Sequence, residues 1–315
     1  MRAALLTECG AAPAIGDRAR PVPADDEILV RVTAASITPL DRLCASGTSY
    51  FGTPATPYVP GVQGVGLRED GTAVWFPTGA GMRPGDGSMA EYSAVRAADT
   101  VELPTGADHA LVAALGLSAV AAQMALTWRG ELRPGERVLV LGAGGVVGQS
   151  AVRLALLAGA DRVVAAARSG PAQRRAALRG RDCGRTPGGE CRGRLAGRTD
   201  AGRGGRPGGS CSRSPLRGSG GGRAADTAAR RLGWSTSATP PSATAPMDSA
   251  TLRGGSLRVL GYTNNELTPA QRSKALTLVA AHAAAGRLKV DFETVRMEDV
   301  AAAWHRTDCR MVLIP

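Results

Sequence analysis

The chain has few aromatic residues, few histidines and no regularly spaced cysteines. Phe, Trp and Tyr make up only 3% of its 315 residues, which include 3 His and 6 Cys. The cysteines form neither a disulfide framework nor a CxxC metal pair, so we interpret them as reduced thiols. No uninterrupted apolar run of about 18 residues predicts a membrane span, and Glu8 interrupts the N-terminal apolar run. We therefore expect no membrane partner and a cytoplasmic location.

One long segment, residues 170–245, contains no Val, Ile, Phe, Tyr or Met. It holds 15 Arg, no Lys and 4 acidic residues, so its charge of +11 equals that of the whole chain. It also holds 17 of the 42 glycines. A basic chain normally predicts a polyanionic partner, but here the basic character belongs to this segment alone. We expect no helix or strand in it to bury an apolar face.

Two hypotheses account for this segment. In the first, it is a disordered arginine-glycine arm that binds RNA or another polyanion. Such arms usually interleave aromatic residues for base stacking, and Trp234 is the only aromatic residue here, so we do not expect a nucleic-acid partner.

In the second hypothesis, the segment is translated from the wrong frame of a GC-rich gene. Leu232–Thr239 contains two serines, Ser235 and Ser237. If both use TCN codons, the same bases read from the third base of the Leu codon can encode a short apolar strand ending in glycine. The original frame would return by about Met247. The second hypothesis explains more of the composition, because it also accounts for the absence of apolar strands from this segment.

The first hundred residues have the pattern of a short-stranded β-barrel. "EILVRVTAASI", from Glu27 to Ile37, predicts a strand, and the following "TPLD" predicts a turn. "YVPGVQGVG" predicts a strand or loop punctuated by glycine. From Asp108 the apolar spacing becomes helical, with Asp108 as the expected cap and Gly130 at the end.

The stretch "GERVLVLGAGGVVGQSAVRLALLAGADRVVAAARS" predicts a strand, a glycine-rich turn, a helix and a second strand. We expect Val138–Leu141 to be buried on both faces of a parallel sheet. The turn contains the expected cofactor-binding residues Gly142, Gly145, Val146, Val147 and Gly148. A pyrophosphate must approach the backbone closely there and meet the free N–H groups of the helix N-terminus, so glycine is needed. The order of these elements predicts a dinucleotide-binding unit.

The end of the second strand bears on the choice of cofactor. Sites for NAD usually place an acidic residue there to bind the ribose 2′-hydroxyl. This chain has Arg168 and Ser169 instead, which favours NADP(H) because Arg168 can accommodate the 2′-phosphate. The alternative is that Arg168 is a solvated surface residue.

Sequence patterns typical of strands and helices resume after the basic segment. "GGSLRVLGYTNN" predicts a strand, and the next helix has Thr268 as its cap, Pro269 in its first turn and Gly286 at its end. "EDVAAAW" and "RMVLIP" predict a last helix and strand. The pattern as a whole indicates an α/β fold.

Several motifs resemble the zinc-independent quinone oxidoreductase branch of the medium-chain dehydrogenase/reductase superfamily. They are, in order, "ITPLDR", "PYVPGVQGVG", "GSMAEY", "GERVLVLGAGGVVGQSA" and "EDVAAAW". The resemblance covers residues 1 to about 169 and about 247 to 315. It implies a GroES-like β-barrel catalytic domain, residues 1–125 and 266–315, and a Rossmann NADP(H)-binding domain, residues 126–265, interrupted by the anomalous segment 170–245.

The resemblance also implies hydride transfer from NADPH to a quinone or an α,β-unsaturated carbonyl compound. The zinc-dependent branch has Cys at the position of Thr38, and Gly-His-Glu where this chain has Gly61, Val62 and Gln63. It has another Cys near Ala113 or Ala114. None of these residues offers a zinc ligand, so we expect no metal.

The substrate-polarising residue is left open between Tyr50 and Thr38. Members of this branch often carry Asn at the Thr38 position and Tyr near Tyr50, so Thr38 departs from the pattern. Asp41 is expected to brace its loop. The resemblance implies a small-molecule substrate and a homodimer.

The chain as printed has lost apolar strands that would complete the nucleotide domain. A deficit of that size exceeds the roughly 5–15 kcal/mol net stability of a domain, so we expect weak or absent NADPH binding, which leaves the activity of the chain as written open.

Overall fold

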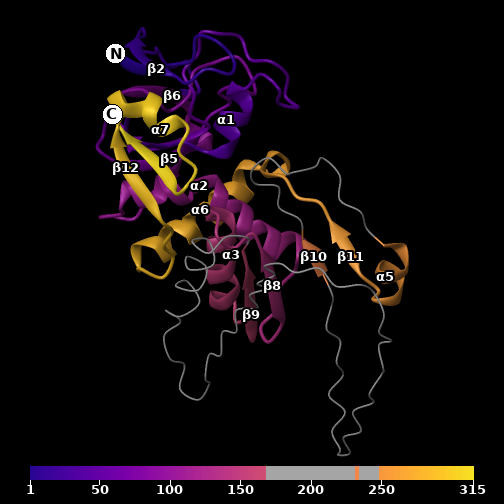
Figure 1. Ribbon diagram of the computed structural model, residues 1–315. Helices are drawn as coiled ribbons and strands as arrows, with labels where there is room; N and C mark the ends of the chain where they lie inside the picture. Colours follow the sequence, from indigo (N-terminus) through magenta and orange to yellow (C-terminus); the bar gives the residue numbers. More distant parts are fainter. Residues whose placement is uncertain (168–230, 234–247) are drawn as a thin grey trace, which may run out of the picture.

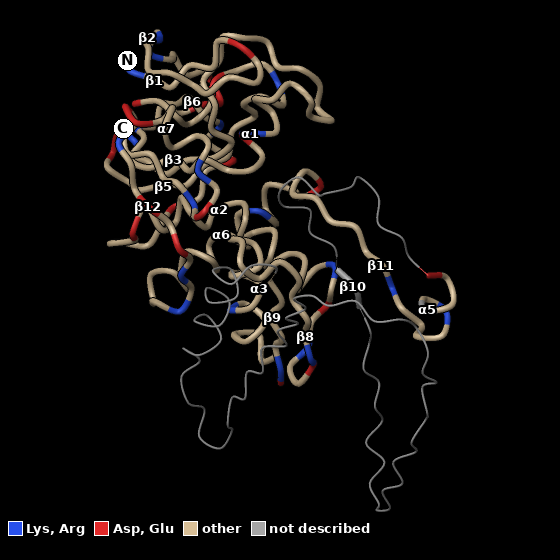
Figure 2. The backbone as a smooth tube through the Cα atoms, in the orientation of Figure 1, with Lys and Arg blue, Asp and Glu red and all other residues tan. Residues whose placement is uncertain are grey.

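The computed structural model describes residues 1–167, 231–233 and 248–315 (Figure 1). The predictions for Arg168 and for the polyanion-binding arm lie outside the described residues, as do those for most of the frame-shifted segment. In Figure 2 basic and acidic residues of the described chain are interspersed, in line with the zero net charge of the sequence outside residues 170–245.

A seven-stranded sheet forms the first part of the fold, and both ends of the chain contribute to it. Its order is β12-β13-β3-β4-β5-β7, and β6 also pairs with β3. The last strand lies antiparallel to β3, with Val312 opposite Ser36. The C-terminal segment thus rejoins the N-terminal sheet, as the resemblance implies. The strands are β3 (Glu27–Ser36), β4 (Gln63–Leu67), β5 (Ala73–Pro77), β6 (Tyr92–Arg96), β7 (Val101–Glu102), β12 (Phe292–Arg296) and β13 (Arg310–Ile314).

Both faces of this sheet pack against apolar clusters, so adjacent residues of a strand can both be buried. Trp75 and Phe76 of β5 are fully buried, as is Val30 of β3. Shorter elements close this core: a hairpin of β1 (Arg2–Leu5) and β2 (Ala14–Asp17), and the helices α1 (Pro39–Ala45) and α7 (Val300–Trp304). The strand predicted from Glu27 and the final helix and strand are confirmed.

The prediction of a turn at "TPLD" was wrong, because these residues begin helix α1. Thr38 is the N-cap, Pro39 occupies the first turn, and Asp41 is the third residue of a reciprocal capping box. Thr and Asp three residues apart satisfy the first free N–H groups of a helix, and proline fits its first turn without losing a needed donor. The same residue types favour turns, which is why the local sequence was ambiguous.

Helix α2 (His109–Met124) crosses the centre of the molecule and continues as a π-helical turn, Ala125–Arg129. Asp108 caps it, as predicted, by accepting a hydrogen bond from Leu111 N at 3.0 Å. Its apolar residues pack with Val65 of β4 on one side and with Leu154 and Leu276 on the other. The helix therefore joins the two halves of the fold.

The span His109–Arg129 is 21 residues long with a mean hydropathy of 1.8, which by length and composition alone would suffice to cross a membrane. Core helices pass the same test, and 56% of the apolar window is buried inside the fold. Ser118 and Gln123 interrupt the apolar residues of this helix, so the sequence contains no uninterrupted apolar run there. Its packing is that of a core helix.

The predicted strand, glycine turn, helix and strand are confirmed as β8 (Arg137–Leu141), α3 (Val146–Leu157) and β9 (Arg162–Ala166), with the two strands parallel. In α3, Leu154 and Ala155 are buried. The chain turns after the helix at Gly159, whose φ of +84° favours glycine.

The prediction that Val138–Leu141 is buried on both faces was wrong. Leu139 is 59% exposed and Leu141 is 67% exposed, while Val140 is buried. Among the described residues β8 pairs only with β9, and β10 (Arg231–Gly233) pairs with β11 (Arg258–Leu260) in a separate two-stranded parallel sheet. A strand is buried on both faces only when neighbouring strands and covering helices are present.

The C-terminal segment forms α5 (Ser249–Gly254), β11 and then α6 (Pro269–Ala284). Thr268 caps α6 through a capping box with Gln271, and Pro269 lies in its first turn, as predicted. Gly286 follows the helix with φ of +66°. Short 3₁₀ turns lie at Ala97–Asp99, Asn264–Glu266 and Met297–Asp299. The domain boundaries at residues 125 and 266 stay predictions.

Candidate cofactor and substrate site

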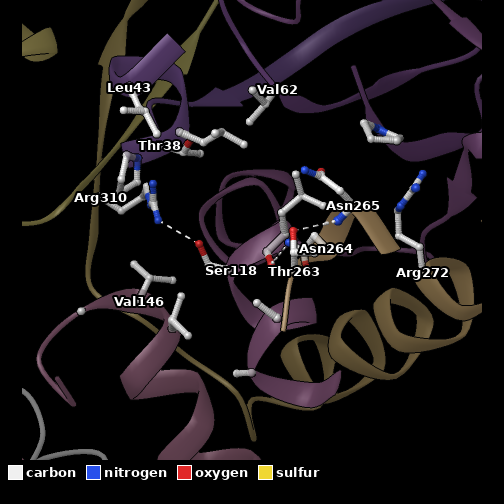
Figure 3. A pocket seen from close by; sticks show the side chains of 18 of the residues that line it. Thr38, Leu43, Val62, Ser118, Val146, Thr263, Asn264, Asn265, Arg272 and Arg310 are labelled. Atoms are coloured by element: carbon white, nitrogen blue, oxygen red, sulfur yellow. Dashed lines mark hydrogen bonds between the residues drawn. The ribbon is translucent and has the colours of Figure 1, made fainter. Parts of the chain in front are cut away.

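A cleft is lined by α1, by Val62 directly before β4, by the middle of α2 and by the start of α3 (Figure 3). The expected catalytic residues Thr38 and Tyr50 both line it, as does the glycine turn. Apolar side chains from both halves of the fold form its walls, together with a few polar groups: Leu43, Val62, Leu117, Ser118, Val146, Val147, Tyr262, Asn264 and Arg310.

The glycine turn has the geometry of a phosphate cradle. Gly142 has φ of +74°, and a Cβ on Gly148 would lie 2.3 Å from the Gly142 oxygen, so both positions require glycine. Gly145 is the N-cap of α3 and has no capping side chain. The first N–H groups of a helix lack partners within it and carry its positive dipole end. Val146 and Val147 therefore present backbone donors at the place where the sequence predicted an anion.

The Thr38 hydroxyl is already engaged. It donates to Asp41 Oδ2 at 2.6 Å and accepts from Asp41 N at 3.2 Å. Because a hydroxyl has one proton, Thr38 has none left to donate to a substrate in this arrangement. The structure thus places Thr38 in the cleft as a capping residue.

Asp41 braces the loop, as expected. Its Oδ1 accepts from Gly61 N at 3.1 Å and from Val62 N at 2.8 Å, and its Oδ2 also accepts from Thr38 N at 2.7 Å. Burial raises the pKa of Asp41, while the hydrogen bonds from Thr38 and Val62 and the charge of Arg310 act in the opposite direction. The carboxylate fixes α1 against the start of β4 on one wall of the cleft.

Tyr50 lies at the rim of the cleft. It is 76% exposed and its ring contacts that of Phe51, with 4.2 Å between the ring centroids. A hydrogen bond from an exposed phenol to a substrate is weakened by competition with water.

The described residues contain no group of three or more His, Cys, Asp or Glu side chains that could hold a metal ion. Val62 and Gln63 occupy positions where the zinc-dependent branch has ligands, and Gln63 is fully buried. A carboxamide and an isopropyl group are poor zinc ligands.

The side chain of Gln63, whose role could not be read from the sequence, is inserted into helix α2. In a regular helix Leu117 N would donate to Ala113 O. Here Leu117 N donates to Gln63 Oε1 at 2.6 Å, and Gln63 Nε2 donates to Ala113 O at 3.0 Å. The side-chain amide thus takes the place of one helical hydrogen bond. Gly116, with φ of +29° and ψ of −130°, forms the kink.

Arg310 was also missed. It is only 7% exposed, and its guanidinium donates to Ile37 O at 2.9 Å and to Ser118 Oγ at 3.0 Å (Figure 3). Its Nε is buried and has no hydrogen-bond partner among the described residues. Burial lowers the pKa of Arg310 to about 10, with Asp41 acting in the opposite direction, so the group stays protonated at neutral pH. A charged residue at the start of an otherwise apolar strand was the available signal.

Tyr262 and Asn264 close the opposite wall. Tyr262 Oη donates to Asn264 Oδ1 at 2.5 Å, and Asn264 Nδ2 donates to Leu117 O at 3.0 Å. Burial raises the pKa of Tyr262. The carbonyl of Leu117, beside the kink, is thereby tied to the segment that follows β11.

The fold and the cleft together define a class of protein. A barrel-like sheet that the chain re-enters at its C-terminus, joined through α2 to a strand–glycine turn–helix–strand unit, is a two-domain α/β architecture with the type of turn that binds dinucleotides. The GroES-like and Rossmann units predicted from the sequence are both present, the second incompletely within the described residues.

Comparisons with known proteins agree with this class. The chain is 34% identical over 167 residues to the quinone oxidoreductase of Lama guanicoe, covering 49% of each protein. It therefore spans about half the length of the curated relatives it matches. No protein-family model matches the chain.

Two solved quinone oxidoreductases share the fold over the full length of both chains. A mycobacterial enzyme superposes with a TM-score of 0.74 at 16% identity. The enzyme of Thermus thermophilus, whose complex with NADPH is also solved, superposes with a TM-score of 0.66 at 24% identity. Over about half of its length the chain is thus similar in sequence to quinone oxidoreductases, and the solved structures share its fold.

Proposed function

We propose that this cleft serves an NADPH-dependent oxidoreductase that transfers hydride to a quinone or an α,β-unsaturated carbonyl compound without zinc. The observation that carries the proposal is the glycine cradle at the N-terminus of α3, which opens into a largely apolar cleft. The relationship to quinone oxidoreductases supports the substrate class. The Arg168–Ser169 pair and the lack of an acidic residue there support NADP(H) over NAD(H).

The residues present fit a dinucleotide. A Cβ on Gly145 would have only the Gly142 oxygen nearby, at 3.8 Å, so the backbone leaves room for a phosphate. The N–H groups of Val146 and Val147 would bind the pyrophosphate, and Gly148 allows the helix to pack against the turn. When bound, NADPH supplies a hydride.

The protein contributes position and a dry environment. Leu43, Val62 and Val146 lie around the cleft, so they would exclude water from the reacting atoms (Figure 3). Fixed hydrogen-bond donors are stronger in such a site than in water, because the local dielectric constant is low. The acceptor would be held between α1 and the kink of α2.

Steady-state oxidation of NADPH tests this proposal. With millimolar NADPH and 1,4-benzoquinone, we expect cofactor consumption in proportion to the protein, unchanged by EDTA, and a higher kcat/KM for NADPH than for NADH. NADPH consumption that stops with EDTA and returns with zinc would contradict the proposal that the reaction needs no zinc. Preference for NADH would contradict the choice of cofactor.

A further inference from the structure

We propose that Ser118 is the residue that donates a hydrogen bond to the acceptor oxygen, in place of the Thr38 or Tyr50 hydroxyl. The inference rests on the proposed function. It names the polarising group of that same cleft.

The first step is the exclusion of Thr38. Its single hydroxyl proton is directed to Asp41 Oδ2 at 2.6 Å, within a fully braced capping box. Releasing it would leave a buried carboxylate short of a donor, which is costly. Thr38 therefore cannot serve the substrate without disrupting α1.

The second step is the hydrogen-bond state of Ser118. Its Oγ accepts from the Arg310 guanidinium at 3.0 Å, so its own proton points elsewhere. Within the described part of the chain no acceptor is recorded for that proton, and Figure 3 shows Ser118 on the cleft wall between Arg310 and Asn264. A hydroxyl that accepts from a buried cation becomes a stronger donor.

The third step is the way in which Ser118 is held in place. Gln63 replaces the hydrogen bond between Ala113 O and Leu117 N, so α2 bends at Gly116, directly before Leu117 and Ser118. Asn264 holds the Leu117 carbonyl from the other side. The position of Ser118 is therefore set by contacts with both halves of the fold.

The chemistry balances with this assignment. Hydride transfer from NADPH adds two electrons and one hydrogen to the acceptor, leaves NADP⁺, and places negative charge on the acceptor oxygen. The Ser118 hydroxyl would stabilise that oxyanion by hydrogen bonding, with the Arg310 charge behind it. A proton from water then neutralises the oxygen, and Ser118 ends the cycle unchanged.

Ser118→Ala tests the proposal, with Ser118→Thr as the conservative variant. We expect Ser118→Ala to lower kcat for quinone reduction by roughly 100-fold, as loss of one oxyanion donor does, with little change in KM for NADPH. The Tm should fall, because the buried Arg310 guanidinium loses an acceptor. Ser118→Thr should recover most of the rate. Thr127→Ala is the matched control, because this hydroxyl lies on the same helical span and donates to Gln123 O.

A probe that needs no cofactor separates this inference from the proposed function. We expect 4-nitrophenolate to bind the wild-type chain with a shift of its visible absorbance, and to lose that shift in Ser118→Ala. Wild-type activity with an unchanged kcat in Ser118→Ala would overturn the inference alone. A Ser118-dependent shift without NADPH oxidation would support the oxyanion site and overturn the proposed function. Absence of both the shift and NADPH oxidation would overturn both.

Discussion

Gly116→Ala is expected to lower the free energy of unfolding by roughly 3 kcal/mol or more, because it overfills the contact between α2 and Gln63. A Cβ at this position would lie 2.0 Å from Gln63 Oε1, and the φ of +29° is already unfavourable for other residues. Either Gln63 moves and leaves Ala113 O and Leu117 N unpaired, or the helix shifts. Urea unfolding followed by circular dichroism measures the change.

Gly106→Ala is the control for backbone conformation alone. Gly106 has φ of +74°, and a Cβ there would meet nothing within 4 Å, so we expect a loss of only about 1–2 kcal/mol. Equal losses in the two variants would mean that the insertion of Gln63 into α2 contributes nothing to stability.

The chain as printed is expected to bind NADPH more weakly than micromolar. Strand β8, which leads into the glycine turn, has Leu139 and Leu141 exposed and β9 as its only described neighbour. A cradle on an incomplete sheet is not held rigidly, so ordering it on binding costs free energy. Titration of NADPH fluorescence measures the affinity, and calorimetry shows whether the chain melts cooperatively. Micromolar binding together with a cooperative melt would contradict the expectation.

The out-of-frame hypothesis makes a separate prediction at the level of the gene. Sequencing independent template DNA across the codons for residues 165–250 is expected to show a compensating insertion and deletion that restores apolar strands. β10 (Arg231–Gly233) pairs in parallel with β11, so a strand lies at this place in the sequence. An unchanged sequence would contradict the out-of-frame hypothesis and leave the hypothesis of an arginine-glycine arm. That hypothesis predicts RNA binding that weakens steeply with salt, which a binding titration at several salt concentrations measures.

Elements with strong local signals could be predicted from the sequence. The cap and proline of α6 at Thr268 and Pro269, and the spacing of Gly142, Gly145 and Gly148, each satisfy a requirement of the backbone within a few residues. Local chemistry was sufficient for those elements.

The polar wall of the cleft could not be predicted in this way. Ser118 and Arg310 are 192 residues apart and meet only because β13 returns to the first sheet beside α2. Gln63 was identified only as a residue that departs from the zinc ligands, and its insertion into α2 depends on tertiary packing. The exposure of Leu139 and Leu141 was missed because the apolar run predicts a buried strand whether or not its neighbours are present.

Transfer of deuterium from NADPH labelled at C4 of the nicotinamide tests the central claim most directly. With an α,β-unsaturated ketone as acceptor and millimolar labelled NADPH, the account predicts one deuterium on the β-carbon of the reduced product per turnover, in the presence of EDTA. Two results would contradict hydride transfer in this cleft. One is a product without deuterium from either C4-labelled epimer of NADPH, and the other is no product from the folded chain at any NADPH concentration.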